Sequence, residues 1–292
     1  MSGFKIGIGP SAYGIRKARS PGQVAWHQFL DDARAVGFDG VELGTWGYLP
    51  LEGKQLSEEL RARHLELAAG ALIADFAFGQ SWSRAEERAR LLCDLFEAVG
   101  TSRLVLIDAP TEPDRSPRRG QSLEPAAWAQ MIDRVNAVAR YSRRRGIMAA
   151  FHPHADTIVQ TDAEIEKFLA DTDPALVGLC FDTAHYAYFM GDPVAFINSH
   201  GDRIKHVHIK NVDAQVRSVV LERQLRFPEA VQLGVMTDLP SGLIDFSTVF
   251  DALAHGAYDG WVVVEHDLDP NSAAKPYEVA LKNRQFLSRI GV

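Results

Sequence analysis

Four side chains with metal-binding groups stand at or just past the ends of four separate apolar, β-branched runs. They are His152 in FHPHADT, Asp182 in CFDTAH, His208 in HVHIKN and Glu265 in VVVEHD. Imidazole nitrogen and carboxylate oxygen form a donor set suited to Mn²⁺ or Co²⁺, with Zn²⁺, Fe²⁺ or Mg²⁺ as further options, and leave coordination positions for a chelating substrate. We therefore predict a divalent-metal site that assists a reaction.

The cysteine content argues against a thiolate-containing metal site. Cys93 falls in a helical pattern and Cys180 in a strand-like run, and neither has a nearby partner for a zinc knot or a redox pair. We therefore expect softer metals to be disfavoured. We also expect both thiols to be free, as suits a reducing cytoplasm.

The net charge and the first residues of the sequence argue against several classes of partner. The 292 residues carry a net charge of -7, so they offer no basic surface for a phosphate backbone. The sequence does not open on a charged leader with an apolar stretch, and no apolar run reaches about 18 residues. No glycine-rich phosphate motif follows a strand, so no nucleotide cofactor is expected. We expect a cytoplasmic protein that binds neither nucleic acid nor membrane.

Short apolar runs alternate with longer amphipathic ones along the chain. The runs predict eight strands, at residues 5–8, 40–43, 66–73, 103–107, 147–151, 177–181, 204–209 and 261–264. The amphipathic patterns predict eight helices, at residues 22–36, 54–64, 83–99, 124–145, 162–170, 193–200, 247–255 and 272–289. Strict alternation indicates parallel strands with crossover helices. Eight such units favour an α/β fold of the (β/α)₈ TIM-barrel class, as a single domain over residues 1–292.

Residues at the expected element ends support this pattern. Four glycines fall just past a helix, where a left-handed C-cap favours glycine: Gly37, Gly100, Gly146 and Gly256. Thr161 and Ser83 are the expected N-caps. Two connections are unusually long, residues 109–123 and 211–246, and both follow the C-terminal end of a strand. Because that end of a barrel carries the active site, both are candidate lids.

Strand alternation decides which side chains meet. Side chains two residues apart share a face, so His206, His208 and Lys210 are expected to point the same way. His152 and His154 do so only if the proline between them leaves the strand regular. The sequence therefore leaves open which of these two histidines reaches the ion.

The same residues have interpretations without function. Asp182 could cap the helix that follows it, and His206 and His208 could be hydrogen-bonded core residues. Four ligand-type residues on four consecutive strand ends are harder to explain in that way. The arginines of the 109–123 connection are better explained as solvated loop residues than as a grip on an acidic substrate.

Five segments of the second half carry a resemblance: FHPHADTIVQT, LCFDTAHYAYFMGDP, RIKHVHIKNVD, GVMTDLPSGLIDF and GWVVVEHDLDP. Together they resemble the inosose (2-keto-myo-inositol) dehydratase group, within the xylose-isomerase-like family of metal-dependent sugar isomerases and epimerases. VELGTWGYLP adds a first-half similarity. The resemblance implies metal-ligand positions at Asp182, His208 and Glu265. It implies a substrate-contacting position at His185.

One position departs from the epimerases of that family. They typically carry a glutamate at the end of the fifth strand, where this chain has His152, as dehydratase-like members also do. In those epimerases two glutamates on opposite faces of the substrate shuttle a proton, whereas only Glu265 remains here. A site with one base suits elimination better than epimerisation.

The resulting hypothesis is a divalent-metal-dependent hydro-lyase that removes water from a cyclic keto-polyol. The ion would acidify the C–H beside the ketone, and Glu265 or His154 would remove that proton. A general acid would then protonate the β-hydroxyl as it leaves. The candidate acids are His185, His206 and Lys210. The expected substrate contacts are Glu42, His206 and His185.

Other functions remain open on the sequence alone. A metal-dependent ketose isomerase or epimerase, or a lyase acting on 3-keto-glycosides, would use the same proton abstraction. An abasic-site endonuclease on this barrel would need a basic groove that the acidic chain does not supply. The expected partner is a small sugar or cyclitol, and a homo-oligomer is an open option.

Overall fold

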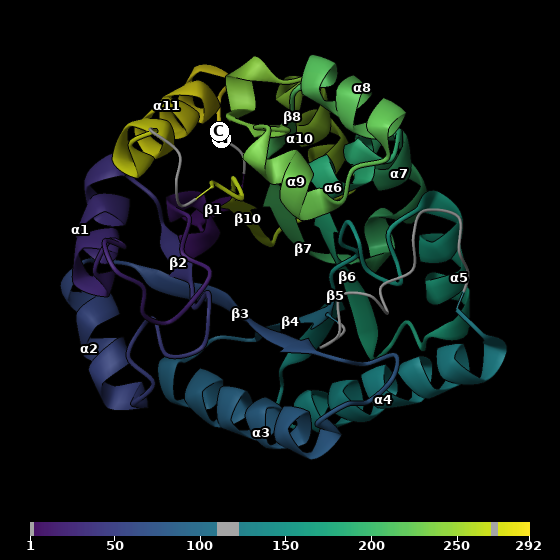
Figure 1. Cartoon of the computed structure of the whole chain (residues 1–292). Helices are drawn as coiled ribbons and strands as arrows, with labels where there is room; N and C mark the ends of the chain where they lie inside the picture. Colours follow the sequence, from purple (N-terminus) through teal and green to yellow (C-terminus); the bar gives the residue numbers. More distant parts are fainter. Residues whose placement is uncertain (1–2, 110–122, 270–273) are drawn as a thin grey trace.

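Eight parallel strands close into a barrel with helices packed around its outside (Figure 1). The structure is a computed structural model that describes residues 3–109, 123–269 and 274–292. The barrel strands are β1 (Lys5–Ile8), β2 (Gly40–Glu42), β3 (Glu66–Ala74), β4 (Arg103–Asp108), β5 (Met148–Phe151), β6 (Val177–Asp182), β7 (Ile204–Ile209) and β10 (Trp261–Val264). Their order around the barrel is β1-β10-β7-β6-β5-β4-β3-β2, and β1 also pairs with β2. The predicted single-domain (β/α)₈ barrel is confirmed.

All eight predicted helices are present with small shifts at their ends. They are α1 (Trp26–Val36), α2 (Gly53–Ala62), α3 (Trp82–Val99), α4 (Pro125–Arg143), α5 (Asp162–Asp171), α7 (Pro193–His200), α10 (Phe246–His255) and α11 (Pro276–Arg289). α1 begins four residues later than expected, because Gly22 has a left-handed φ of 76° and the N-cap Ala25 is still extended. Across the described parts of the chain, no helix has the length and apolar character needed to cross a bilayer.

The expected helix caps are mostly confirmed. Gly37, Gly100 and Gly146 have φ angles of 92°, 81° and 74°, in the left-handed region. Gly256 does not, because its φ is -73° and Ala257 makes the left-handed turn one residue later. Thr161 forms a capping box with the third residue of α5. The prediction that Ser83 is the N-cap of α3 was wrong, because α3 begins at Trp82.

The connection from residue 211 to 246 contains regular structure that the sequence analysis missed. It holds β8 (Asn211–Val212), α8 (Ala214–Arg223), α9 (Phe227–Gln232) and β9 (Met236–Thr237), with β8 and β9 paired antiparallel. In α8 only Val220 is buried, so the helix has no apolar stripe that a periodicity argument could detect. α6 (Thr183–Tyr188) was missed because it has only six residues. Residues 110–122 of the other long connection lie outside the described residues.

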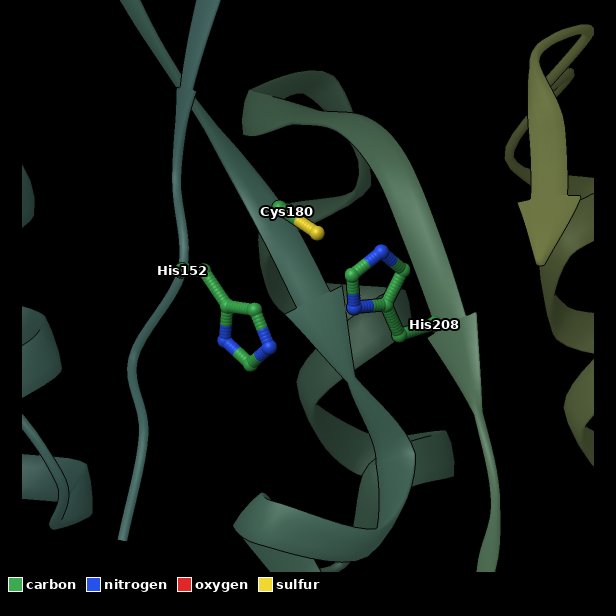
Figure 2. Close-up of side chains that lie close together, drawn as sticks. All are labelled: His152, Cys180 and His208. Atoms are coloured by element: carbon green, nitrogen blue, oxygen red, sulfur yellow. The ribbon is translucent and has the colours of Figure 1, made fainter. Parts of the chain in front are cut away.

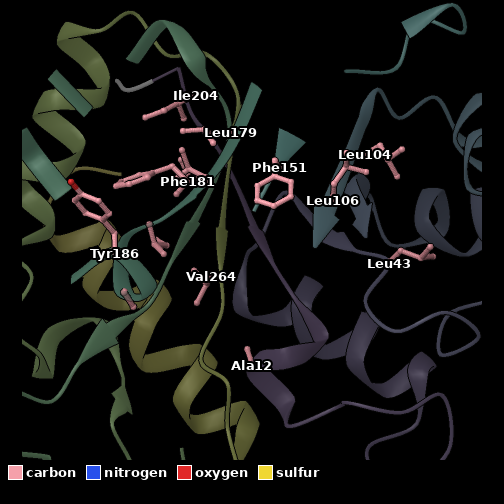
Figure 3. Close-up of a cluster of buried hydrophobic side chains, with 14 of the residues drawn as sticks. Ala12, Leu43, Leu104, Leu106, Phe151, Leu179, Phe181, Tyr186, Ile204 and Val264 are labelled. Atoms are coloured by element: carbon pink, nitrogen blue, oxygen red, sulfur yellow. The ribbon is translucent and has the colours of Figure 1, made fainter. Parts of the chain in front are cut away.

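On β5 and β6, large apolar side chains pack outward against the surrounding helices. Figure 3 shows part of the outer core, where Phe151 and Phe181 lie among buried side chains. Phe151 stacks on Phe168 of α5 with ring centroids 4.1 Å apart, and Phe181 stacks on Phe196 of α7 at 4.8 Å. A separate cluster on β3 to β6 is formed by the small residues Ala69, Val105, Ala150 and Cys180. Small inward side chains leave room for polar groups at the mouth.

Candidate metal centre and active site

The four residues singled out from the sequence lie together at the C-terminal mouth of the barrel. His152, Asp182, His208 and Glu265 each offer a donor atom, and these atoms lie within 4.8 Å of one another. The Asp182 Oδ2 atom is 3.8 Å from His152 Nε2 and 3.9 Å from His208 Nδ1. His208 Nδ1 lies 3.4 Å from Glu265 Oε2. The donors come from β6, β7 and the ends of β5 and β10, which are neighbouring strands.

The hydrogen bonds around the two imidazoles leave a lone pair on each for a cation. The His208 Nε2 atom lies 2.9 Å from Glu42 Oε1, so Nε2 carries a proton and Nδ1 is the atom that can turn a lone pair to an ion. Burial alone would lower the pKa of His208, but Cys180, Glu265 and Glu42 outweigh burial and hold that pKa well above its usual range, so an ion displaces the Nδ1 proton. That Nδ1 is buried and has no hydrogen-bond partner among the described residues. His152 Nδ1 lies 2.8 Å from the Pro153 carbonyl oxygen, which leaves Nε2 as the acceptor. These residues fit a divalent ion in donor type and in tautomer.

Asp182 has both of the roles that the sequence left open. Its Oδ1 accepts hydrogen bonds from the Ala184 and His185 backbone N–H groups, each at 2.9 Å, and so caps α6. Its Oδ2 faces the other candidate ligands. The capping interaction fixes the carboxylate plane, and this directs the second oxygen into the site.

Glu42 contacts two imidazoles of the neighbouring half of the barrel. Its Oε1 is 2.7 Å from His206 Nε2 and 2.9 Å from His208 Nε2. Burial alone would raise the pKa of Glu42, but the charge of His208 and the two imidazole hydrogen bonds outweigh burial and hold that pKa well below its usual range. His206 is fully buried and is not among the residues that line the cavity. The structure therefore places His206 behind His208 and does not bring it to the expected substrate contact.

Lys210 is buried among three carboxylates. Its Nζ lies 3.0 Å from Asp182 Oδ2, 2.9 Å from Glu265 Oε2 and 2.8 Å from Asp267 Oδ2. Burial alone would lower the pKa of Lys210, but these carboxylates outweigh it and hold that pKa well above its usual range. A lysine held in its charged form is a weak proton donor near neutral pH. Three carboxylates against one ammonium leave an excess of negative charge, which favours cation binding.

His154 and His185 form a pair beside the four candidate ligands. Their ring centroids are 3.8 Å apart, and His185 Nε2 lies 3.6 Å from Asp267 Oδ2. The Phe227 ring covers both, with centroids 5.3 Å from His154 and 5.0 Å from His185. Burial lowers the pKa of His154, and burial with neighbouring positive groups lowers that of His185 further. Burial alone would raise the pKa of Asp267, but Lys210 lowers it to about 2.

A cavity of about 710 Å³ opens over this cluster. Its wall includes Glu42, Asp108, His152, His154, His208 and Glu265. The volume is within the range of about 300–1,000 Å³ that small-molecule sites occupy. His185 and Lys210 do not line the cavity and lie beneath its surface.

The 211–246 segment, expected as a lid, supplies part of that wall through Arg226 and Phe227. Arg226 Nε lies 2.8 Å from Asp156 Oδ2, and the Phe227 backbone N–H donates to the same oxygen at 2.7 Å. Asp156 follows the β5 histidines and has a left-handed φ of 62°. These contacts fasten the start of α9 to the loop that carries His154.

Cys180 corrects the expectation that neither thiol has a metal-binding partner. Its Sγ and one nitrogen each of His152 and His208 lie within 4.8 Å of one another (Figure 2). Cys180 precedes Asp182 by two residues on β6 and therefore shares its inward face. Burial raises the pKa of this thiol to about 11. The expectation that Cys180 lacks a nearby metal-binding partner was therefore wrong, although the same period of two could have located it. That softer metals are disfavoured stays a prediction.

The comparisons with known proteins identify the family. The family model described as xylose isomerase-like TIM barrel matches residues 30–289. The chain belongs to that family. The inosose dehydratase of Geobacillus thermodenitrificans (strain NG80-2) is 31% identical over 290 residues, which cover 97% of this chain and 96% of the relative. An inosose dehydratase of Bacillus anthracis is 32% identical over 295 residues, with the same shares covered.

Solved structures with low sequence identity share the fold. The structure of the probable 3-DHS dehydratase AsbF from Bacillus anthracis aligns with a TM-score of 0.75 and 14% identity, over 98% of this chain and 99% of that one. The similarity to inosose dehydratases over nearly the whole chain supports an enzyme of the dehydratase class.

Proposed function

We propose that the protein is a divalent-metal-dependent hydro-lyase that removes water from a cyclic keto-polyol of the 2-keto-myo-inositol type. The observation that carries this proposal is the imidazole of His152 at the end of β5, beside the neutral pair of His154 and His185. The full-length similarity to inosose dehydratases supports the same substrate class.

An ion held by His152, Asp182, His208 and Glu265 would supply Lewis-acid polarisation of a substrate ketone. Both oxygens of Glu265 are engaged in the structure. Oε1 accepts a hydrogen bond from Ser11 Oγ at 2.9 Å, and Oε2 lies 2.9 Å from Lys210 Nζ. We therefore assign Glu265 to holding the ion, and a different residue acts as the base.

His154 has the tautomer that a base needs. Its Nδ1 lies 2.8 Å from the Ala155 carbonyl oxygen and carries the proton, so Nε2 is left with the lone pair. His154 also lines the cavity, and Phe227 shields its ring from one side. In our proposal His154 Nε2 takes the proton from the carbon beside the ketone, and an enolate forms.

The same imidazole can complete the elimination. The protonated His154 returns its proton to the β-hydroxyl, the C–O bond breaks, and water leaves with the electron pair of that bond as the C=C bond forms. His185 supports His154. Its Nδ1 accepts from the Ala155 N–H at 3.4 Å, so its Nε2–H points toward Asp267. Lys210 keeps its proton and holds Asp267 in place.

The test is a turnover assay with Mn²⁺ or Co²⁺ and 2-keto-myo-inositol, following the ultraviolet absorbance of the conjugated product. Wild-type protein should give a rising signal that chelation abolishes. His154→Gln should keep its bound Mn²⁺ and lose turnover by about a hundredfold or more. No absorbance change across several keto-polyols would refute the dehydratase. Release of an aglycone from a 3-keto-glycoside would point to a glycoside lyase instead.

A further inference from the structure

A thiol lies directly beneath the four candidate ligands. Figure 2 shows the sulfur of Cys180, on β6, pointing toward the His208 ring, while the His152 ring extends from the segment that follows β5. The donor atoms of His152, Cys180 and His208 lie within 4.8 Å of one another, and all three residues are buried. Cys180 is level with His206 in the β6–β7 pairing, whereas Asp182 is level with His208. The thiol is therefore one layer deeper in the barrel than the carboxylate.

We propose that His152, Cys180 and His208 form a second, deeper cation position that takes thiophilic ions such as Cd²⁺ and Zn²⁺ in place of the ion above it. The position uses none of the carboxylates of the proposed catalytic set. It stands whether or not the proposed dehydration is correct.

The donor chemistry of the two positions differs. Asp182 and Glu265 offer hard oxygen ligands, which suit Mn²⁺ or Mg²⁺. Two imidazoles and a thiolate form a soft set, typical of zinc sites, and the thiol gives up its proton to solvent as the ion binds. The lone pairs on His152 Nε2 and His208 Nδ1 are available to either ion because Pro153 and Glu42 fix both tautomers.

The two positions exclude each other. The Pro153 carbonyl engages one nitrogen of His152 and Glu42 engages one nitrogen of His208, so each ring has a single nitrogen left for an ion. One imidazole lone pair binds one ion. His152, His208 and Glu265 line the cavity, but Cys180 does not. An ion in the deeper position therefore lies further from any substrate, so thiophilic ions compete with the upper ion and lower activity.

The experiment is a metal titration of the full chain after chelation. One equivalent of Cd²⁺ should produce a thiolate-to-cadmium charge-transfer band in the ultraviolet. Added to the Mn²⁺-loaded protein, Cd²⁺ should release Mn²⁺, which is counted by electron paramagnetic resonance. Cys180→Ser should lose the band and bind Cd²⁺ about tenfold or more weakly, while its Mn²⁺ affinity stays the same. Cys93→Ser, the matched control in α3, should behave as wild type.

Several results would overturn the proposal. One is the absence of a charge-transfer band in the wild type, and another is an undiminished band in Cys180→Ser. Simultaneous binding of Mn²⁺ and Cd²⁺ would contradict the shared imidazoles. Cys180→Ala is a second variant that also lacks the sulfur, and alanine already occupies the neighbouring inward positions 69 and 150. It shows whether an effect of Cys180→Ser comes from the buried hydroxyl and not from the loss of the thiol. Loss of Mn²⁺ binding in both Cys180 variants would refute the separation into two positions.

Discussion

The two halves of the barrel have the same backbone pattern but carry different side chains at the mouth. The half formed by β5, β6, β7 and β10 contributes all four candidate ligands. The half formed by β1 to β4 contributes small or apolar wall residues such as Ala71 and Ile107, with Glu42 and Asp108 as its carboxylates there. The fold therefore supplies strand ends that are alike in backbone geometry in both halves. The inward residue at each end decides whether it binds an ion or shapes the wall.

The halves also differ in the partners of their buried carboxylates. In the ligand-bearing half, Lys210 lies within 3.0 Å of three carboxylates. In the other half, Asp108 is fully buried and forms no ion pair with a residue that the structure describes, and burial raises its pKa to about 7. Glu42 links the halves across the site, because it reaches the β7 imidazoles from β2.

The largest effect should come from the ligand-bearing half. Asp182→Asn keeps an Oδ1 that can cap α6 and removes the charge that faces the ion. We expect turnover to fall by about a thousandfold, since several kcal/mol of metal-assisted stabilisation are lost. Mn²⁺ affinity should fall as well, while the melting temperature changes little. Asp182→Ala is the control that also loses the cap. Undiminished Mn²⁺ binding in both variants would remove Asp182 from the ligand set.

An intermediate effect should come from Glu42. Glu42→Gln removes the charge that fixes the His208 tautomer, so Mn²⁺ affinity should fall by about 10–100-fold. Isothermal titration with Mn²⁺ measures this directly, and Glu58→Gln on the exposed face of α2 is the matched control. If Glu42 instead only contacts substrate, as the sequence suggested, KM would rise and the Mn²⁺ affinity would not change.

A third effect, on stability alone, should come from the half without ligands. Because the folded pKa of Asp108 is raised to about 7, the folded state holds a proton that the unfolded state releases near pH 4. Its contribution to the free energy of unfolding is therefore largest at low pH and declines as the pH rises toward about 7, by at most about 4 kcal/mol.

Asp108→Asn should remove this decline, because the amide stays neutral and can still accept from the Phe76 and Ala77 N–H groups. Urea unfolding of both proteins at pH 5 and pH 8 measures it. The variant should gain stability relative to wild type at pH 8. Parallel pH dependences would contradict a raised pKa at Asp108.

The sequence predicted the barrel well because each strand and helix leaves a local pattern. The alternation of two residues also placed His206 and His208 on one face of β7. Cys180 was placed on a strand correctly, but its neighbours His152 and His208 come from strands β5 and β7. Their proximity depends on the strand register, which the linear sequence does not specify.

The sequence analysis missed other site residues for the same reason: their roles depend on contacts between distant segments of the chain. Asp267 follows Glu265 by two residues, and the same alternation points to it, but its role depends on Lys210 arriving from β7. Phe227 lies on a six-residue helix whose position over His154 is set by the contacts with Asp156. Short helices leave little periodicity, so tertiary contacts alone determine where such residues lie.

The central claim is that His152, in place of a carboxylate, leaves a site that eliminates water. The most direct measurement is the mass of the product formed from 2-keto-myo-inositol by the Mn²⁺-loaded protein in D₂O. We expect a product that has lost one water, with no rearranged product of the substrate's mass. An isomer of unchanged composition, carrying solvent deuterium at the carbon beside the ketone, would contradict it and indicate an epimerase or isomerase.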